Sequence, residues 1–175
     1  MSKDLIIMTQ QLSWLDSPSE KAIEWHLYID GAARGNPGPA GVGIYITKHK
    51  KSMLREGFFI GECTNNQAEY TALLLGICRL HIYLDQHDIV CIFSDSQLLV
   101  RQIEKVYQVK NPVLQKLNQR AHELLKAMNY IVRHISRSEN SIADALANDG
   151  IDQARPIPRD LLQACGVTTT GLPCE

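Results

Sequence analysis

The chain has 175 residues, of which 45% are hydrophobic and 21% charged, as expected for one globular domain with short tails. No apolar run reaches the roughly 20 residues that span a bilayer, and the first residues lack the small-residue cleavage site of a secretory signal, so neither a membrane protein nor a secreted one is expected. The formal net charge of −1 argues against a nucleic-acid binder that relies on a broadly basic surface.

The cysteine pattern indicates a reducing compartment. The five cysteines are scattered, and no CxxC pair occurs, so their spacing suggests neither a zinc site nor a disulfide framework. Reduced thiols fit a cytoplasmic protein. The cysteines are Cys63, Cys78, Cys91, Cys165 and Cys174.

The first half of the chain predicts a meander of strands. Residues 1–23 show no clear period and are expected to be an N-terminal extension. The alternating segment 24–30 predicts a strand that ends at Asp30, and the Gly- and Pro-rich segment 31–41 predicts a loop. Two further strands, 42–47 and 53–60, flank a basic turn at 48–51 that is expected to be a solvated hairpin tip. Short connections between three strands predict antiparallel pairing.

The second half predicts alternating helices and strands. Residues 66–84 are apolar nearly all round, which is typical of a helix buried between a sheet and other helices. The remaining predicted elements are an inner strand at 88–94, helices at 96–106 and 113–127, a strand at 130–136 and a helix at 141–149. The order βββαβααβα predicts an α/β fold, a mixed five-stranded sheet with helices on both faces. This domain would span residues 24–150, and residues 151–175 would form a C-terminal tail.

Four carboxylates occupy distinctive places in this scheme. Asp30 and Asp95 follow strands that chain order allows to be neighbours, whereas Glu69 and Asp144 lie one turn into helices, so all four could converge at one edge of the sheet. Clustered carboxylates repel one another unless cations neutralise them, and their hard oxygens favour Mg²⁺ or Mn²⁺. Two such ions form the standard clamp for displacement at phosphorus. Taken singly, each acid also fits a turn former, a helix cap or a first-turn acid.

The sequence around these acids resembles the type 1 ribonuclease H family over about Trp25 to Asn148. Four motifs occur in the family's order: YIDGAARGNPGPAGVG, TNNQAEYTALLLGI, FSDSQLLVRQI and RHISRSENSIADALAN. The resemblance implies the ribonuclease H-like fold and cleavage of the RNA strand of RNA–DNA hybrids by two metal ions, leaving 3′-hydroxyl and 5′-phosphate ends. By motif position it also implies that Asp30, Glu69, Asp95 and Asp144 bind the metal ions.

The resemblance also implies roles for polar residues around the acids. His134 corresponds to the family's mobile catalytic histidine, which can shuttle protons and help product leave, although the residue also fits a half-exposed strand position. Asn36 fits a simple turn as well, and Asn66 fits a cap of the long helix. The positions that match substrate-binding residues of the family are Asn36, Thr64, Asn65, Asn66, Ser96 and Gln97.

One departure from the family bears on affinity. Residues 106–111 pass directly from one predicted helix to the next, so the lysine-rich handle of some relatives is absent and few phosphate contacts are expected.

Two bound divalent ions would bring the formal charge from −1 to +3 and concentrate positive potential at the site.

Two other classes of protein remain as alternatives. One is a non-catalytic nucleic-acid binding module on the same fold. The absence of one of the four acids would favour this alternative. The other is an unrelated Mg²⁺ or nucleotide protein, which would need a phosphate loop that GAARGNPG does not supply. The expected partner is an RNA–DNA hybrid, with no membrane, no obligate protein partner and a monomeric state.

Overall fold

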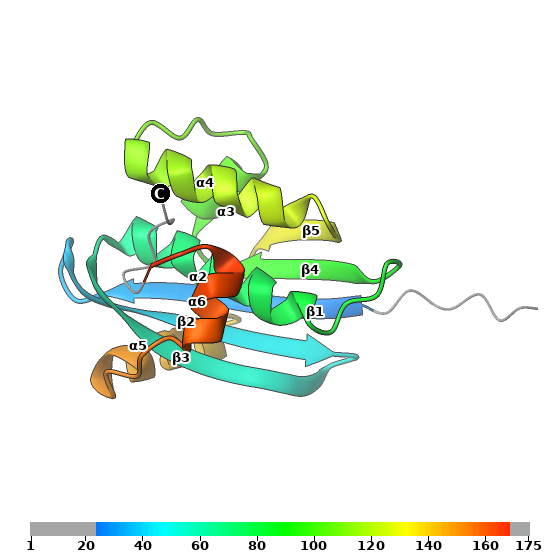
Figure 1. Cartoon of the computed structure of the whole chain (residues 1–175), viewed down its shortest axis with the longest axis horizontal. Helices are drawn as coiled ribbons and strands as arrows, with labels where there is room; N and C mark the ends of the chain where they lie inside the picture. Colours follow the sequence, from blue (N-terminus) through cyan, green and yellow to red (C-terminus); the bar gives the residue numbers. More distant parts are fainter. Residues whose placement is uncertain (1–23, 169–175) are drawn as a thin grey trace, which may run out of the picture.

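A mixed five-stranded sheet forms the centre of the computed structural model, which describes residues 24–168 (Figure 1). Its strands lie in the order β3-β2-β1-β4-β5, with β1, β2 and β3 antiparallel and β1, β4 and β5 parallel. This arrangement confirms the predicted meander and sheet. The predicted N-terminal extension, residues 1–23, lies outside the described residues. The strands are β1 (Glu24–Ala33), β2 (Gly38–Lys48), β3 (Lys51–Cys63), β4 (Ile89–Ser94) and β5 (Asn129–His134).

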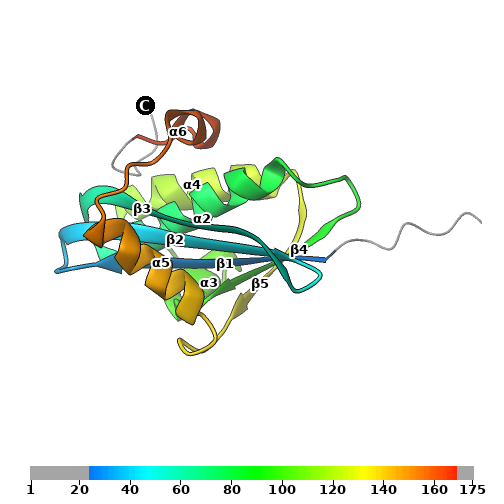
Figure 2. The same ribbon diagram turned by 90° about the horizontal axis from the view of Figure 1, so that it is seen from below.

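Helices cover both faces of the sheet, as predicted. Helices α2, α4 and α6 lie over one face, and α5 lies on the other (Figure 2). No helix within residues 24–168 combines the length and the apolar character that crossing a membrane requires. The helices are α2 (Asn65–His81), α3 (Gln97–Ile103), α4 (Pro112–Leu125), α5 (Ser141–Asp152) and α6 (Arg159–Cys165).

The hairpin between β1 and β2 is tighter than the sequence predicts. Residues 31–41 carry the Gly and Pro content of a loop, yet the ladder continues through Ala32 paired with Gly41 and Ala33 paired with Ala40. Only residues 34–37 therefore lie outside the two strands. The pairing holds the backbone beyond Asp30 in the sheet, which limits how far that carboxylate can move.

Helix α2 is the buried helix that its composition predicts, with a different start and end. Thr64 caps it in a capping box with Gln67, so Asn66 lies inside the first turn and is not the cap. The helix ends at His81, three residues before the predicted end, where Ile82 is 70% exposed. A fixed start matters for function because Glu69 lies just inside it.

Two glycines let helices approach the sheet closely. A Cβ at Gly31 would lie 2.2 Å from the backbone nitrogen of Glu69, and a Cβ at Gly43 would lie 2.0 Å from the carbonyl oxygen of Ala143. Both separations are shorter than any tolerable contact, so only glycine fits. The starts of α2 and α5 are therefore held against β1 and β2, close to the end of β1.

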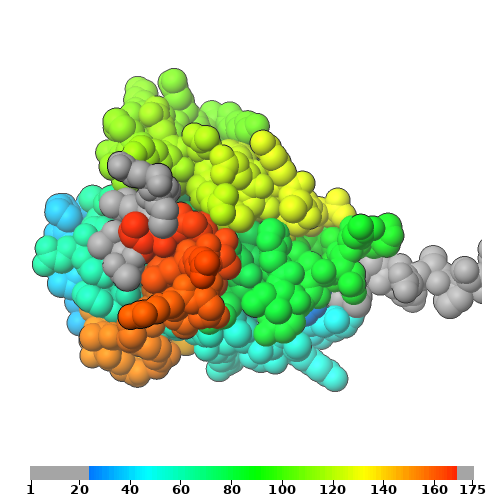
Figure 3. All heavy atoms as spheres, viewed as in Figure 1, coloured from blue at the N-terminus to red at the C-terminus, as the bar shows by residue number. Residues whose placement is uncertain are grey.

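The predicted C-terminal tail at 151–175 is wrong for residues 151–168. Helix α5 continues to Asp152, Phe59 and Pro156 form an isolated bridge, and α6 packs against α2. Arg120 of α4 donates from Nε to the carbonyl oxygen of Cys165 at 2.9 Å, so α6 fills the surface beside α4 (Figure 3). The apolar residues of this segment complete the core. They are Ile157, Leu161, Cys165 and Val167, all buried.

We expect Leu161→Ala to lower the free energy of unfolding by about 2–5 kcal/mol, because it would open a cavity under α6 where Leu161 is 2% exposed. Gln163→Ala, at an exposed position on the same helix, should change it by no more than about 0.5 kcal/mol. Urea unfolding of both variants measures the difference. Equal stability of the two would mean that α6 does not belong to the cooperative core.

Candidate active site

The carboxyl ends of two parallel strands bring Asp30 and Asp95 together. Tyr28 of β1 pairs with Phe93 of β4, and each acid stands two residues further along its strand. The two carboxyls are close enough to share a hydrogen bond. Glu69 reaches the same point from α2, so one carboxylate oxygen from each of the three acids lies within 4.8 Å of the others. The predicted convergence of these three acids at one sheet edge is found in the structure.

Burial and mutual repulsion alter the protonation of this cluster. Burial, followed by repulsion from Asp95 and Asp144, raises the pKa of Asp30 to about 7. Burial and the charges of Asp30 and Asp95 also raise the pKa of Glu69 well above its ordinary value, and a hydrogen bond from the backbone of Gly31 offsets this only in part. Glu69 Oε2 is buried without a hydrogen-bond partner. A buried acceptor of this kind, among other carboxylates, fits a cation ligand.

Asp144 stands beside the cluster rather than inside it. It lies in the first turn of α5 and accepts a hydrogen bond from Arg137 Nη2 at 2.7 Å. The Arg137 side chain is 77% exposed, so this ion pair contributes little stability and a stronger cation can compete with it. The sequence alone does not single out Arg137, because its contact depends on the path of residues 135–140.

Asn140 fixes the position of Asp95. It is 1% exposed, and its Nδ2 donates to the carbonyl oxygen of Ile29 at 2.9 Å and to Asp95 Oδ1 at 3.1 Å. Asn140 occupies the N-cap position of α5 but makes no side-chain cap bond there. Its amide instead connects the end of β1 to the carboxylate after β4. Its place at a helix start within the last motif was the only sequence signal of this contact.

The four acids open into a cleft of about 480 Å³. Its lining is dominated by polar groups from β1 and from the starts of α2, α3 and α5. Such a cleft suits a charged ligand rather than an apolar one. The lining includes Asp30, Gly31, Asn65, Glu69, Asp95, Ser96, Arg137, Asp144 and Asn148.

Comparisons with known proteins decide the family. A family profile described as "Reverse transcriptase-like" matches residues 28–150. "Ribonuclease HI" of Halobacterium salinarum is 41% identical over 132 residues, which cover 74% of this chain and 65% of that protein. "Ribonuclease H" of Coxiella burnetii is 34% identical over 143 residues, covering 73% of this chain and 90% of that protein. The chain belongs to the type 1 ribonuclease H family.

Solved structures of the same family agree with the fold. LC11-RNase H1, solved in complex with an RNA/DNA hybrid, superposes with a TM-score of 0.71 at 38% identity, covering 74% of this chain and 98% of that one. The RNase H1 of Halobacterium salinarum gives the same TM-score at 37% identity. As the sequence indicates, residues 104–111 lead directly from α3 to α4, with no added helical handle between them.

The other residues predicted by resemblance to the ribonuclease H family lie around the cleft or near it. Asn65 and Ser96 line it, and the backbone N–H of Asn65 donates to Asn36 Oδ1 at 3.1 Å, which joins the β1–β2 hairpin to α2. Ser96 also caps α3, so Asp95 is not the cap. His134 is exposed, and its Nε2 lies 3.1 Å from the backbone oxygen of Asp95. Outside the lining lie the side chains of Thr64, Asn66, Gln97 and His134.

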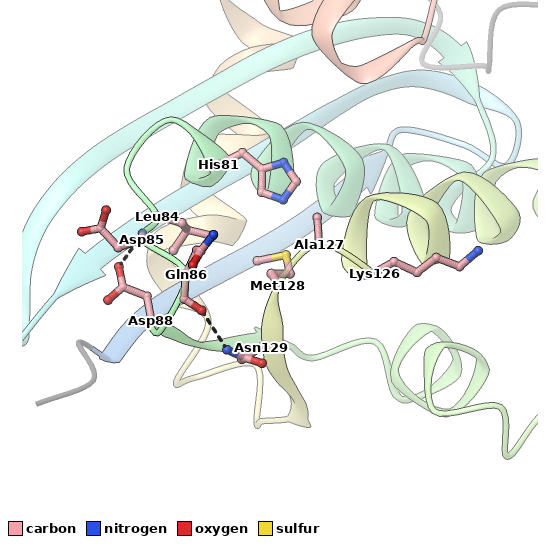
Figure 4. A pocket seen from close by; sticks show the side chains of 9 residues that line it. All are labelled: His81, Leu84, Asp85, Gln86, Asp88, Lys126, Ala127, Met128 and Asn129. Atoms are coloured by element: carbon pink, nitrogen blue, oxygen red, sulfur yellow. Dashed lines mark hydrogen bonds between the residues drawn. The ribbon is translucent and has the colours of Figure 1, made fainter. Parts of the chain in front are cut away.

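A second cavity lies at the opposite end of the sheet from the four acids. It measures about 470 Å³ and is formed by the α2–β4 and α4–β5 connections (Figure 4). His81 points into it, and burial lowers the pKa of this histidine. The cavity holds Asp85 and Asp88, but Asp88 Oδ2 already accepts hydrogen bonds from Trp25 Nε1 and from the backbone of Asp85. Its position separates it from the active-site cleft and its four acids.

We expect the metal-free protein to lose stability as pH rises from about 4 to about 7. The unfolded chain releases the Asp30 proton near its ordinary pKa of 3.8, whereas the folded protein keeps it until about 7, so unfolding is favoured progressively across that window. Asp30→Asn should remove this contribution. Urea unfolding in a chelating buffer at several pH values measures the slope for both proteins. Parallel pH profiles would contradict the shift assigned to Asp30.

Proposed function

We propose that this protein hydrolyses the RNA strand of RNA–DNA hybrids, leaving 3′-hydroxyl and 5′-phosphate ends. The observation that carries the proposal is the convergence of Asp30, Glu69 and Asp95 within 4.8 Å in a polar cleft. LC11-RNase H1, which shares the fold at 38% identity, has been solved with an RNA/DNA hybrid. Membership of the type 1 ribonuclease H family supports the same chemistry for this chain.

The donor set fits divalent metal ions. All candidate ligands are carboxylate oxygens, which suit Mg²⁺ and also accept Mn²⁺. The buried, unpartnered Oε2 of Glu69 is an acceptor that a cation would satisfy. Asp144 completes the set once its exposed ion pair with Arg137 opens. Two ions bound by these acids would neutralise them and supply the Lewis acidity needed for displacement at phosphorus.

The chain's own residues then position the reacting groups. Asn140 holds the Asp95 carboxylate against the end of β1, and the Gly31 backbone orients Glu69. His134 lies at the end of β5, close enough through Nε2 to the Asp95 backbone to reach the cleft without being fixed in it. We assign it proton transfer to or from product groups, for which an exposed imidazole is suited.

Recognition of RNA rests on polar groups at the rim of the cleft. The 2′-hydroxyl can donate and accept hydrogen bonds, which distinguishes the RNA strand from DNA in the wide minor groove. Asn36 and Asn65 are tied together by a hydrogen bond and present their amides at this rim. Asn66, Thr64, Ser96 and Gln97 extend it along the starts of α2 and α3.

The thiols support a cytoplasmic setting. Within residues 24–168 all four cysteines are free and buried, which suits a reducing cytoplasm. We infer a cytoplasmic protein that acts as a monomer, since all four acids come from one chain.

A cleavage assay on four labelled substrates tests the function. We expect Mg²⁺-dependent cleavage of RNA–DNA and no cleavage of DNA–DNA or single-stranded RNA. An RNA–RNA duplex measures how strictly the enzyme requires a DNA strand. Ligation of the products to a 3′-hydroxyl acceptor checks for 5′-phosphate ends. If the protein bound the hybrid but did not cleave it with Mg²⁺ or with Mn²⁺, it would instead be a non-catalytic binding module.

A further inference from the structure

Three side chains of different chemistry meet at the opposite end of β1 and β4 from the active site. Glu24 and His26 stand two residues apart on β1, so they share one face of the strand. His26 is paired in register with Cys91 on the neighbouring parallel strand, which places Cys91 on the same face. One ligand atom from each residue lies within 4.8 Å of the others.

Two separations among these atoms come close to those of a tetrahedral site, one of them shorter and one within its range. Around Zn²⁺, with bonds of about 2.0–2.3 Å, ligand atoms lie about 3.3–3.7 Å apart. Here His26 Nε2 lies 3.0 Å from Glu24 Oε1, and Cys91 Sγ lies 3.5 Å from the same oxygen. We propose that Glu24, His26 and Cys91 bind a divalent transition metal, and that Zn²⁺ is the preferred ion. The sulfur and nitrogen donors separate this site from the all-oxygen magnesium site.

The surroundings hold two of the ligands in place. The ring of His26 packs edge-on against Phe93, with centroids 5.3 Å apart, and Cys91 is 5% exposed. The Glu24 side chain is 60% exposed, so it has room to move and open space for an ion. That motion is small because its oxygen already contacts both partners.

An open side remains for a fourth ligand. A cavity of about 290 Å³ adjoins the cluster and is lined by Glu24, His26, His49 and Lys50. His49 stands in the turn between β2 and β3 and can supply an imidazole, or water can occupy the position. Lys50 and Arg133 lie nearby and oppose a cation. The thiolate and carboxylate ligands contribute two negative charges that offset them.

The site has a structural role distinct from cleavage. His26 and Cys91 each precede an active-site acid by four residues, so the two sites are about 13 Å apart along the strands. A metal held there would join β1 to β4, the two strands whose ends carry Asp30 and Asp95. Zinc should therefore raise the melting temperature without being required for Mg²⁺-dependent hydrolysis.

Cobalt binding by the full chain in excess Mg²⁺ tests the proposal. Magnesium occupies the carboxylate site, and only a thiolate ligand gives a sulfur-to-cobalt charge-transfer band. We expect that band at one Co²⁺ per chain, competition by Zn²⁺, and loss of the band in Cys91→Ser. His26→Gln and Glu24→Gln should weaken Co²⁺ binding at least about tenfold, because loss of a ligand costs no less than loss of an outer-shell contact. His87→Gln, an exposed histidine outside the cluster, is the matched control.

Three outcomes would overturn the proposal. They are no charge-transfer band in the wild type, a band that persists in Cys91→Ser, and equal affinity in Glu24→Gln and His87→Gln. Glu24→Gln alters an exposed side chain, so it remains informative if Cys91→Ser fails to fold. Zinc-induced thermal stabilisation should disappear in the same variants that lose the band.

Discussion

Asp95→Asn should lower hydrolysis of an RNA–DNA hybrid by about a thousandfold or more while the variant still folds, because the loss of one metal-binding charge removes several kcal/mol of transition-state stabilisation. The substitution keeps the size of the side chain and an Oδ1 that can still accept from Asn140. It also removes one negative charge that raises the pKa of Asp30 and Glu69. The metal-free variant should therefore be at least as stable as the wild type.

Steady-state kinetics on one hybrid, together with thermal unfolding, measure both effects. Asp149→Asn is the matched control, because Asp149 is an exposed acid further along α5 and does not line the cleft. It should retain nearly full activity. Turnover by Asp95→Asn near the wild-type rate would refute the assignment of Asp95 to the metal site. Equal losses in both variants would indicate a general charge effect instead.

The order of the elements could be predicted because local patterns dominate them. The alternating strands and the continuously apolar α2 leave little choice of secondary structure. Asn111 and Pro112 open α4 as their sequence suggests, with the Asn111 side chain accepting from Val113 and Leu114. Such signals depend only on neighbours in the chain.

Helix α6 was missed because its stability depends on distant partners. It has seven residues and follows Pro158, so propensity alone gives a weak signal. Leu161 and Cys165 are buried only because α2 and α4 provide a surface for them. A loop-like composition therefore concealed a segment that completes the core.

The acids could be placed from the sequence, but their supporting contacts could not. Strand ends and helix starts are local features, so all four acids were expected to converge. Asp30, Glu69 and Asp95 do so within 4.8 Å, whereas Asp144 lies beside them and pairs with Arg137. The bond from Asn140 to Asp95 spans 45 residues and depends on the packing of α5. The grouping of Glu24, His26 and Cys91 depends on the register of β1 against β4, which the spacing of cysteines along the chain does not reveal.

His134→Ala should lower kcat by about 100-fold, within the usual range for general acid–base assistance, and should leave Mg²⁺ affinity nearly unchanged. The geometry motivates this division of roles. His134 Nε2 contacts the backbone oxygen of Asp95 and not a carboxylate, whereas three acids already converge to form a hard-ligand site. An imidazole adds little to the affinity of such a site for Mg²⁺. The KM for hybrid should also change little, because the residue lies outside the cleft lining.

Calorimetric Mg²⁺ titration, paired with kinetics across a pH series, separates the possible roles of His134. A proton-transfer role predicts that the pH dependence of the wild-type rate changes in His134→Ala. His122→Ala, on α4 and away from the cleft, is the control and should leave both profiles unchanged. A large loss of Mg²⁺ affinity in His134→Ala would make the residue a metal ligand. An unchanged kcat would leave it without a role in the reaction, since the contact to the Asp95 backbone would then be structural only.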